Sequence, residues 1–212
     1  MKNTYKIVVA RYNENVEWLT PEMENCLIYN KGEKMNLVNE IISENVGRES
    51  ESYLKYIISN YDFLPDVVIF TQARISDHID GGTDEISYLT RMRNEAILHG
   101  KSQTYLTYQQ PQTQTLHCCW DREWNIYDGE YFLKNHYKNN TPILFIDWFK
   151  EHINPHYPNP INIYRAGLFA VKREIIISKE KSYYERLMKE VDHHINPTEG
   201  HFFERSWFYI FD

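Results

Sequence analysis

Cysteine is scarce in this sequence, which holds Cys26, Cys118 and Cys119. An odd number of cysteines without a spaced framework excludes a disulfide-stapled secreted domain and indicates reduced thiols in a cytoplasmic protein. The adjacent pair has no second cysteine pair near it, which disfavours a metal site built on cysteine.

Long apolar runs are also missing. No stretch approaches the roughly 20 residues of a membrane-spanning helix, and the first residues lack the apolar region of a secretory signal. The sequence therefore predicts a soluble protein without a membrane span, which stays in the compartment where it is made.

Basic runs and nucleotide-binding loops are absent too. The formal charge is −7 and the pI is near 5.7, whereas a nucleic-acid binder needs a basic face, so nucleic acid is excluded as a partner. No G-x-G-x-x-G, phosphate-binding P-loop or G-x-S-x-G motif occurs, which argues against a dehydrogenase, an ATPase or a serine hydrolase. No repeat or linker divides the 212 residues, so we expect one domain over residues 1–212.

Apolar and aromatic residues are plentiful, and their spacing predicts both strands and helices. Buried strands are expected over Lys6–Arg11, Asn25–Asn30 and Asp66–Thr71, and a further strand over Ile161–Val171. Helices are expected from Glu49 to Tyr61 and over Glu85–Leu98, Ile143–His152, Ser182–His193 and Phe202–Phe211, with a short one over Asn13–Leu19. A loop or insertion is expected over Lys31–Val46, and 101–141 gives no clear assignment.

Strands and helices that alternate in this way predict an α/β fold with a mainly parallel sheet flanked by helices. Ligands of such sheets bind beyond the carboxyl ends of the strands. The polar segments found there are Arg11–Glu14, Asn30–Gly32 and Gln72–Asp80. In the first of them, Tyr12 can stack on a base and Glu14 can accept hydrogen bonds from ribose hydroxyls.

The segment after the third strand places Asp77, His78 and Asp80 within four residues. Two carboxylates this close repel each other unless a cation lies between them, and a hard divalent ion would bridge them to a diphosphate. The alternative is an aspartate that caps a turn, with no ligand at all.

Arg48 precedes the first long helix, within Asn45–Glu49. Gly47 allows close approach of the backbone, and the N–H groups at a helix start suit a phosphate. A capped helix with Glu49 in its first turn would explain this segment without a ligand. It would leave Arg48 unexplained, because the helix dipole disfavours arginine there.

Acidic side chains gather again near the end of the sequence, at Glu199 and Glu204, with His201 between them. Glu204 and Trp207 are three apart and share a helical face, an arrangement that suits a sugar. An amphipathic helix that packs Trp207 into the core is the alternative. Gly167, inside an expected strand, is typical of close approach by a ligand.

Taken in order, the motifs resemble glycosyltransferase-like domains of GT-A type. They are V-V-A-R-Y-N-E-x-x-x-W-L, I-Y-N-K-G, N-V-G-R-E-x-x-x-Y-L, LPDVVIFTQ…DH, G-L-F-A-V-K-R-E-I, YYERL and F-E-R-S-W-x-x-I-F, between Val8 and Phe211. The likeness extends in particular to the amino-terminal glycosyltransferase domains of larger chlorovirus proteins that build the capsid glycan, which would place the protein in a host cytoplasm.

This resemblance implies one Rossmann-like domain that binds a UDP-sugar of the glucose or rhamnose class and glycosylates an oligosaccharide or glycoprotein, with retention favoured. It implies Mn²⁺ or Mg²⁺ at the donor diphosphate, held by Asp77 and Asp80, with His78 beside them. Their spacing departs from the D-x-D motif of GT-A enzymes, so which acid binds the metal stays open. Arg11, Tyr12, Glu14 and Asn30 would line the base and ribose.

In the implied reaction, the metal and Arg48 stabilise the leaving diphosphate. An inverting enzyme also needs a base, for which Glu204, Asp212 and Asp80 are candidates. Two other hypotheses remain. One is a module that binds nucleotide sugars or glycans without turnover, and the other is a metal-dependent phosphohydrolase using the acidic segment.

Overall fold

The computed structural model of the chain describes residues 3–79, 81–108, 138, 143 and 145–212. Asp80, Cys118 and Cys119 therefore lie outside the described residues, and so does most of the segment that gave no clear assignment. Cys26 is buried with a free thiol. Within the described part of the chain, no helix combines the length and apolar character needed to cross a membrane.

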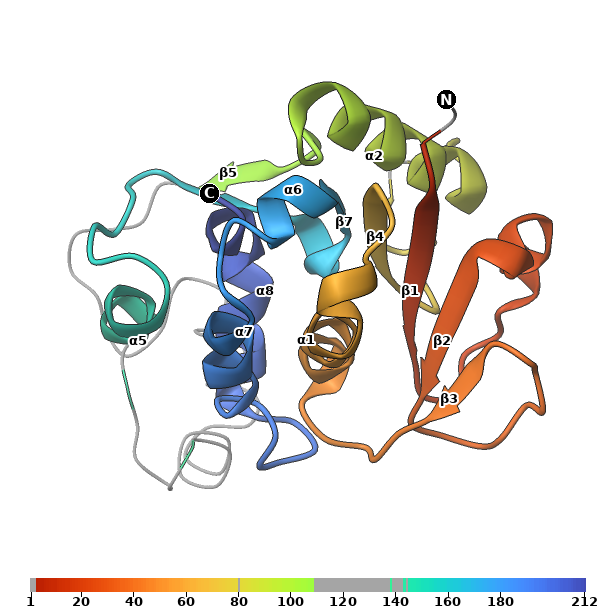
Figure 1. Ribbon diagram of the computed structural model, residues 1–212, viewed down its shortest axis with the longest axis horizontal. Helices are drawn as coiled ribbons and strands as arrows, with labels where there is room; N and C mark the ends of the chain where they lie inside the picture. Colours follow the sequence, from red (N-terminus) through yellow and green to blue (C-terminus); the bar gives the residue numbers. More distant parts are fainter. Residues whose placement is uncertain (1–2, 80, 109–137, 139–142, 144) are drawn as a thin grey trace.

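The centre of the fold is a five-stranded sheet in the order β3-β2-β1-β4-β7 (Figure 1). Its strands are β1 (Tyr5–Arg11), β2 (Cys26–Asn30), β3 (Glu40–Ile42), β4 (Val67–Gln72) and β7 (Phe169–Lys172). The first four are parallel, and β7 pairs with β4 in the antiparallel sense. This confirms the predicted α/β class with a mixed, mainly parallel sheet.

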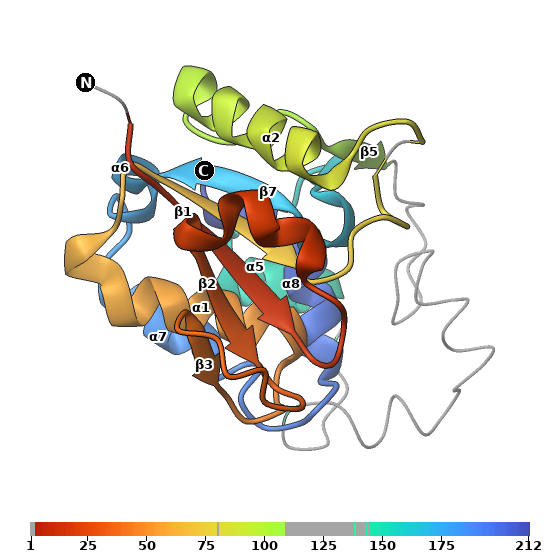
Figure 2. The same cartoon turned by 90° about the vertical axis from the view of Figure 1, so that its right-hand side faces the viewer.

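Helices cover both faces of the sheet (Figure 2). One face packs against α1 (Arg48–Asn60), α7 (Lys181–Met188) and α8 (Thr198–Ile210), with α5 (Phe145–His152) against α8. The other face packs against α2 (Glu85–His99) and the 3₁₀ helix η1 (Glu17–Asn25). Shorter elements are η2 (Tyr61–Phe63), η4 (Arg165–Gly167), α6 (Arg173–Ile176) and a two-stranded sheet of β5 (Leu106–Tyr108) and β6 (Ile161–Ile163).

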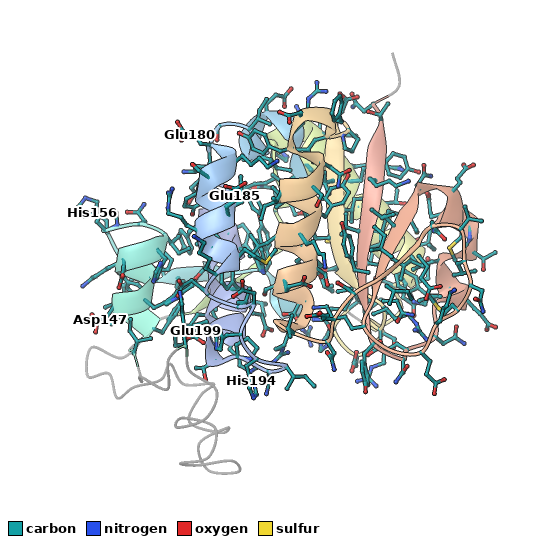
Figure 3. All side chains as sticks on the ribbon, turned by 60° about the horizontal axis from the view of Figure 1, so that its bottom comes forward. Asp147, His156, Glu180, Glu185, His194 and Glu199 are labelled. Carbon is teal, nitrogen blue, oxygen red and sulfur yellow. The ribbon has the colours of Figure 1, made fainter. Side chains whose placement is uncertain are left out.

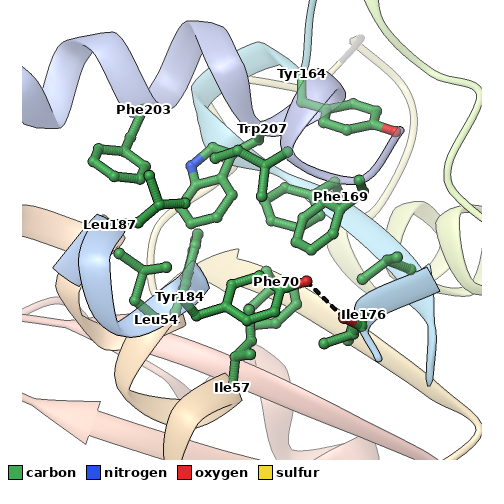
Figure 4. Packing of buried hydrophobic residues seen from close by; sticks show 14 of the residues in the cluster. Leu54, Ile57, Phe70, Tyr164, Phe169, Ile176, Tyr184, Leu187, Phe203 and Trp207 are labelled. Atoms are coloured by element: carbon green, nitrogen blue, oxygen red, sulfur yellow. Dashed lines mark hydrogen bonds between the residues drawn. The ribbon is translucent and has the colours of Figure 1, made fainter. Parts of the chain in front are cut away.

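Aromatic side chains dominate the core on the α1 and α8 side. Trp207 of α8 packs on Phe169 of β7, which packs on Phe70 of β4 with ring centroids 4.9 Å apart (Figure 4). The Tyr184 hydroxyl donates to the Ile176 carbonyl oxygen at 2.8 Å, so this buried polar atom has a partner. The large rings fix α8 against the sheet and thereby set where its first turn lies.

Two predicted elements differ from the structure. The expected strand over Ile161–Val171 is divided into β6 and β7, which belong to different sheets, because Ala166 and Gly167 adopt left-handed φ angles of 54° and 66°. The expected loop over Lys31–Val46 contains β3, whose three residues pair with β2. The other predicted strands and helices are present with shifted ends, and the first helical segment is the 3₁₀ helix η1.

The sheet brings the ends of distant segments to one edge. The chain runs from β1 to β2 and β3 on one side, then crosses through α1 to β4 on the other side of β1. The point between β1 and β4 is therefore the topological switch point, where open α/β sheets bind ligands at their carboxyl edge.

Candidate functional site

A cavity of about 240 Å³ lies at the carboxyl ends of β1 and β4, and we call it the β1–β4 cavity. The last residues of β1 and β4, the residue after β2 and the first turn of α1 line it. The lining residues are Ala10, Arg11, Tyr12, Glu14, Lys31, Asn45, Arg48, Glu49 and Gln72. Five predicted donor-site residues thus lie at one place, since Asn30 is hydrogen-bonded to Arg11 at its wall.

Arg11 holds this edge together through its guanidinium group. Its Nη1 donates to Asn30 Oδ1 at 2.7 Å and to the Glu33 carbonyl oxygen at 3.0 Å, and its Nε donates to the Glu14 carbonyl oxygen at 2.8 Å. Asn30 in turn donates to the Glu33 carbonyl oxygen at 2.7 Å. The two buried side chains therefore fix the loops after β1 and β2.

The side chains that these loops present are more accessible. Tyr12 is 51% exposed, and its backbone N–H donates to Glu14 Oε2 at 2.7 Å. This bond fixes the Glu14 carboxylate beside the cavity. An exposed aromatic ring and an oriented carboxylate are thus placed on the same rim.

Charged side chains are buried at the first turn of α1, where Glu49 and Glu51 belong to the helix and Lys31 approaches from the residue after β2. Lys31 forms an ion pair with Glu51 at 2.8 Å, and its ammonium group also donates to the carbonyl oxygens of Val46 and Arg48. Burial lowers the pKa of Lys31, while Glu51 opposes this effect. A buried lysine that satisfies backbone carbonyl groups holds the segment before α1 in place.

Arg48 begins α1 in a left-handed conformation, with φ of 51°. Its Nη1 lies 2.8 Å from Nε2 of His201, in the first turn of α8, and its Nε lies 3.5 Å from Glu49 Oε2. His201 Nδ1 lies 3.9 Å from Glu204 Oε2. We call these four residues the Arg48 network, and it joins the starts of α1 and α8 next to the cavity.

The environment shifts the pKa values of the two carboxyl groups of this network in opposite directions. Burial raises the pKa of Glu49, and the nearby Glu204 carboxylate adds to this. Burial also acts on Glu204, but its contact with His201 and the charge of Arg48 hold its pKa well below the usual value. Burial and the Arg48 charge lower the pKa of His201 to about 4. Glu204 is therefore ionised and His201 neutral at neutral pH, a division typical of functional sites.

The η4 turn closes the far side of this region. Gln72 at the end of β4 donates from Nε2 to the Ala166 carbonyl oxygen at 2.8 Å. A side chain at Gly167 would lie 3.8 Å from Trp207 and 3.9 Å from Glu49, which are ordinary contacts. Glycine is therefore favoured here by its left-handed φ of 66° and not by a lack of room for a side chain. Gly167 lies in the η4 turn and not in the expected strand.

The acidic segment after β4 lies on the surface. Asp77 Oδ2 is 3.1 Å from Arg74 Nη2, and Asp77 Oδ1 is 3.6 Å from His78 Nε2. Among the described residues, no three histidine, cysteine or acidic side chains are grouped as metal ligands. Asp77 and His78 do not form a ligand set by themselves, and the predicted second acid, Asp80, lies outside the described residues.

Asp212 lies apart from the cavity, and Glu199 does not line it. Asp212 forms an ion pair with Lys101, whose backbone pairs with Val171 near the start of β4, at the opposite edge of the sheet. The structure therefore does not bring Asp212 to the site. Glu199 accepts a hydrogen bond from the Lys138 backbone N–H at 2.8 Å, and it is labelled in Figure 3 with His194 of the preceding loop.

Sequence reasoning missed Glu49 and Lys31 as parts of the site. Glu49 read as an ordinary first-turn acid, although it lies four residues before Tyr53 and eight before Ile57, on the buried stripe of α1. Extending that stripe backwards would have found it. Lys31 lies in the polar segment Asn30–Gly32 expected at the ligand edge, but no local pattern singles it out, since its partners are backbone carbonyl groups and Glu51 of a different element.

Comparison with known proteins gives one result. The model of a family described as "Protein of unknown function (DUF3431)" matches residues 7–212. No curated protein and no solved structure matches the chain. Because the match covers nearly all of the sequence, the chain belongs to the DUF3431 family.

Proposed function

We propose that the protein is a glycosyltransferase that takes a sugar from a UDP-sugar and transfers it to a glycan acceptor. The observation that carries the proposal is the β1–β4 cavity. It lies at the topological switch point of the sheet and combines the exposed ring of Tyr12, the carboxylate of Glu14 and the guanidinium of Arg48. A GT-A arrangement, with one sheet that holds the nucleotide, is part of this proposal.

Each of these groups suits one part of a nucleoside diphosphate. The Tyr12 ring stacks on the base, Glu14 accepts hydrogen bonds from the ribose hydroxyls, and Arg48 donates to the phosphates. Arg11 and Asn30 act behind them, because their own hydrogen bonds hold the loops that carry Tyr12 and Glu14. Their part in binding is to position those loops.

The diphosphate needs positive charge as it leaves. A divalent ion bound there would supply a Lewis acid. The described residues of the acidic segment do not fit that role alone, because Asp77 pairs with Arg74 at 3.1 Å. In the proposed reaction, Arg48 therefore supplies this positive charge. Binding of Mn²⁺ or Mg²⁺ remains a prediction, and it requires Asp80.

Glu204 is the carboxylate candidate that the proposal keeps for the transfer step. It is ionised beside Arg48 and His201. In the reaction, the acceptor oxygen bonds to the anomeric carbon while the bond from that carbon to the diphosphate oxygen breaks. An ionised carboxylate either takes the hydroxyl proton or stabilises positive charge on the sugar, depending on stereochemistry.

A screen of nucleotide sugars tests the proposal. The melting temperature is measured with UDP-sugars and with sugars of other nucleotides, with and without Mn²⁺, and glycosylated acceptor is sought by mass spectrometry. UDP-sugars at about 100 times their dissociation constant should stabilise the fold by about 2.7 kcal/mol. Binding without any glycosylated product would indicate a binding module, and no shift with any UDP-sugar would contradict the donor site.

A further inference from the structure

A second cavity, of about 400 Å³, opens at the same edge of the sheet, on the side of η1 and α2. We call it the Trp18 cavity. Its walls come from the loop after β1, the start of η1, the loop after β4 and the first residue of α2. The lining residues are Glu14, Asn15, Trp18, Ala73, Arg74, Ile75, Ser76 and Glu85.

Trp18 gives this cavity a fixed aromatic wall. Its indole Nε1–H donates to the Ala73 carbonyl oxygen at 2.7 Å, across from η1 to the loop after β4. The ring is half-buried against the core residues of this face. Its orientation is therefore set before any ligand arrives, which lowers the entropic cost of binding to it.

The polar groups around the ring select the kind of ligand. Glu14 and Glu85 are hydrogen-bond acceptors on two sides of the cavity. The charge of Arg74 is partly neutralised by Asp77, 3.1 Å away. Two carboxylates repel a phosphate or an acidic peptide, whereas they accept hydrogen bonds from hydroxyl groups. A neutral ligand with one apolar face and several hydroxyls matches the ring and the carboxylates together.

Glu14 is the one described residue that lines both cavities. Both cavities reach the end of β4, where Gln72 lines one and the next residue, Ala73, lines the other. A molecule in the Trp18 cavity would therefore lie next to a molecule in the β1–β4 cavity, with Glu14 between them.

We propose that the Trp18 cavity binds the acceptor, a neutral saccharide that stacks on the Trp18 ring and donates hydroxyl hydrogen bonds to Glu14 and Glu85. This inference rests on the proposed function, because it assigns the second substrate of that reaction to a place beside the first. Trp18 is then the residue that selects a saccharide, and Glu14 and Glu85 hold it beside the donor.

The test uses ¹⁵N-labelled protein without donor. Methyl glycosides and disaccharides of glucose, rhamnose and xylose are titrated in, and the indole resonance of Trp18 is followed after assignment by its absence in Trp18→Phe. We expect at least one saccharide to shift this resonance. Trp18→Ala should lower the affinity for that saccharide about tenfold, the loss expected for one aromatic contact. Trp18→Phe should keep most of the affinity.

Two further variants serve as controls. Tyr12→Ala, in the β1–β4 cavity, should lower the affinity for UDP and leave saccharide binding unchanged. Trp18→Ala should leave UDP binding unchanged. Ser76 is exposed on the cavity wall, so Ser76→Leu fills the cavity without disturbing the core and should also weaken the saccharide. This variant keeps the test valid even when Trp18→Ala does not fold.

The outcomes separate the two proposals. UDP binding with no saccharide shift at Trp18, or saccharide binding that Trp18→Ala and Ser76→Leu leave unchanged, would overturn the acceptor site alone. Failure of UDP and every UDP-sugar to bind would overturn the proposed function. A saccharide bound in the Trp18 cavity would then no longer be assigned as an acceptor.

Discussion

At the scale of single residues, the main feature is the amount of charge that is buried beside the cavity. Arg48 contacts Glu49 and His201, and it also lines the β1–β4 cavity. Its positive charge therefore belongs both to the cavity and to the Arg48 network. Removing it would take a hydrogen-bond donor from the proposed ligand and also a counter-ion from the buried Glu49 and the partly buried Glu204.

Arg48→Ala should therefore weaken binding of a UDP-sugar by about 10- to 100-fold, since a charged hydrogen bond contributes about 1.5–3 kcal/mol. It should also lower the melting temperature, because Glu49 and Glu204 lose the arginine whose charge most lowers their pKa values. Calorimetric titration and thermal melting of the same variant measure the two effects. Arg48→Lys, which keeps the charge, should recover most of the stability, and unchanged donor affinity in Arg48→Ala would show a purely structural role.

The acidic segment allows a second test at this scale, with a matched control nearby. Asp77 is exposed and pairs with an exposed arginine, so Asp77→Asn should change stability by no more than about 0.5 kcal/mol. Asp84 caps α2 by accepting from the Ser87 N–H at 2.8 Å, so Asp84→Ala should cost about 1 kcal/mol.

With a metal in the site, Asp77→Asn should also abolish the Mn²⁺-dependent part of UDP-sugar affinity, which Asp84→Ala should keep. Calorimetric titrations with and without Mn²⁺ compare the two variants. Full Mn²⁺ dependence in Asp77→Asn would remove Asp77 from the metal site.

At the scale of elements, the start of α1 depends on Gly47. It has a φ of 65°, and a Cβ there would lie 2.6 Å from the Glu51 Cβ and 2.7 Å from the Val191 carbonyl oxygen. Only glycine therefore lets the chain enter α1 with Arg48 and Glu49 turned to the cavity.

Gly47→Ala should destabilise the fold by about 3 kcal/mol or more, because backbone strain and a clash with the main chain add. Gly82 is the matched control, since its φ is 96° and a Cβ there would meet nothing within 4 Å. Gly82→Ala should cost only about 1 kcal/mol of strain. Urea unfolding measures both, and equal costs would show that the clash at Gly47 is relieved by local movement.

Elements with a regular period could be predicted from the sequence, and those set by backbone conformation could not. The β-branched run of β1 and the stripe of Tyr53 and Ile57 in α1 have clear periods. The break at Ala166 left no such trace, because an apolar segment reads as a strand whether or not one residue adopts a left-handed φ.

For the site, position after a strand was enough to find Arg11, Tyr12 and Glu14. The contact between Arg48 and His201 joins residues 153 positions apart, and no local pattern encodes it.

At the scale of the whole molecule, two buried groups act on stability in opposite ways as pH changes. Burial raises the pKa of Glu199 to about 7, so its protonated form is favoured in the fold and its contribution is lost as pH rises from about 4.5 to 7. His201 has a pKa lowered to about 4, so stability is lost as pH falls from about 6.5 to 4. The two effects partly cancel between about pH 4.5 and 6.5.

Glu199→Gln should remove one of them. Relative to the wild-type protein, the variant should gain stability progressively above pH 4.5 and reach a difference on the order of 3 kcal/mol at pH 8. The amide keeps the oxygen that accepts from the Lys138 N–H. Urea unfolding at pH 4, 6 and 8 measures the difference, and a constant difference across this range would contradict a raised pKa for Glu199.

The contact between Arg48 and His201 also has a consequence for synthesis of the chain. During synthesis, β1, β2 and the start of α1 emerge from the ribosome long before α8 does. The nascent chain therefore exposes the apolar face of α1, and Arg48 lacks its contact with His201. Closing so long a loop is entropically costly and slow. The Arg48 network would then form late, when α8 docks, and a chain that stops short of α8 would be a substrate for chaperones and proteases instead of a partly folded protein with a complete β1–β4 cavity.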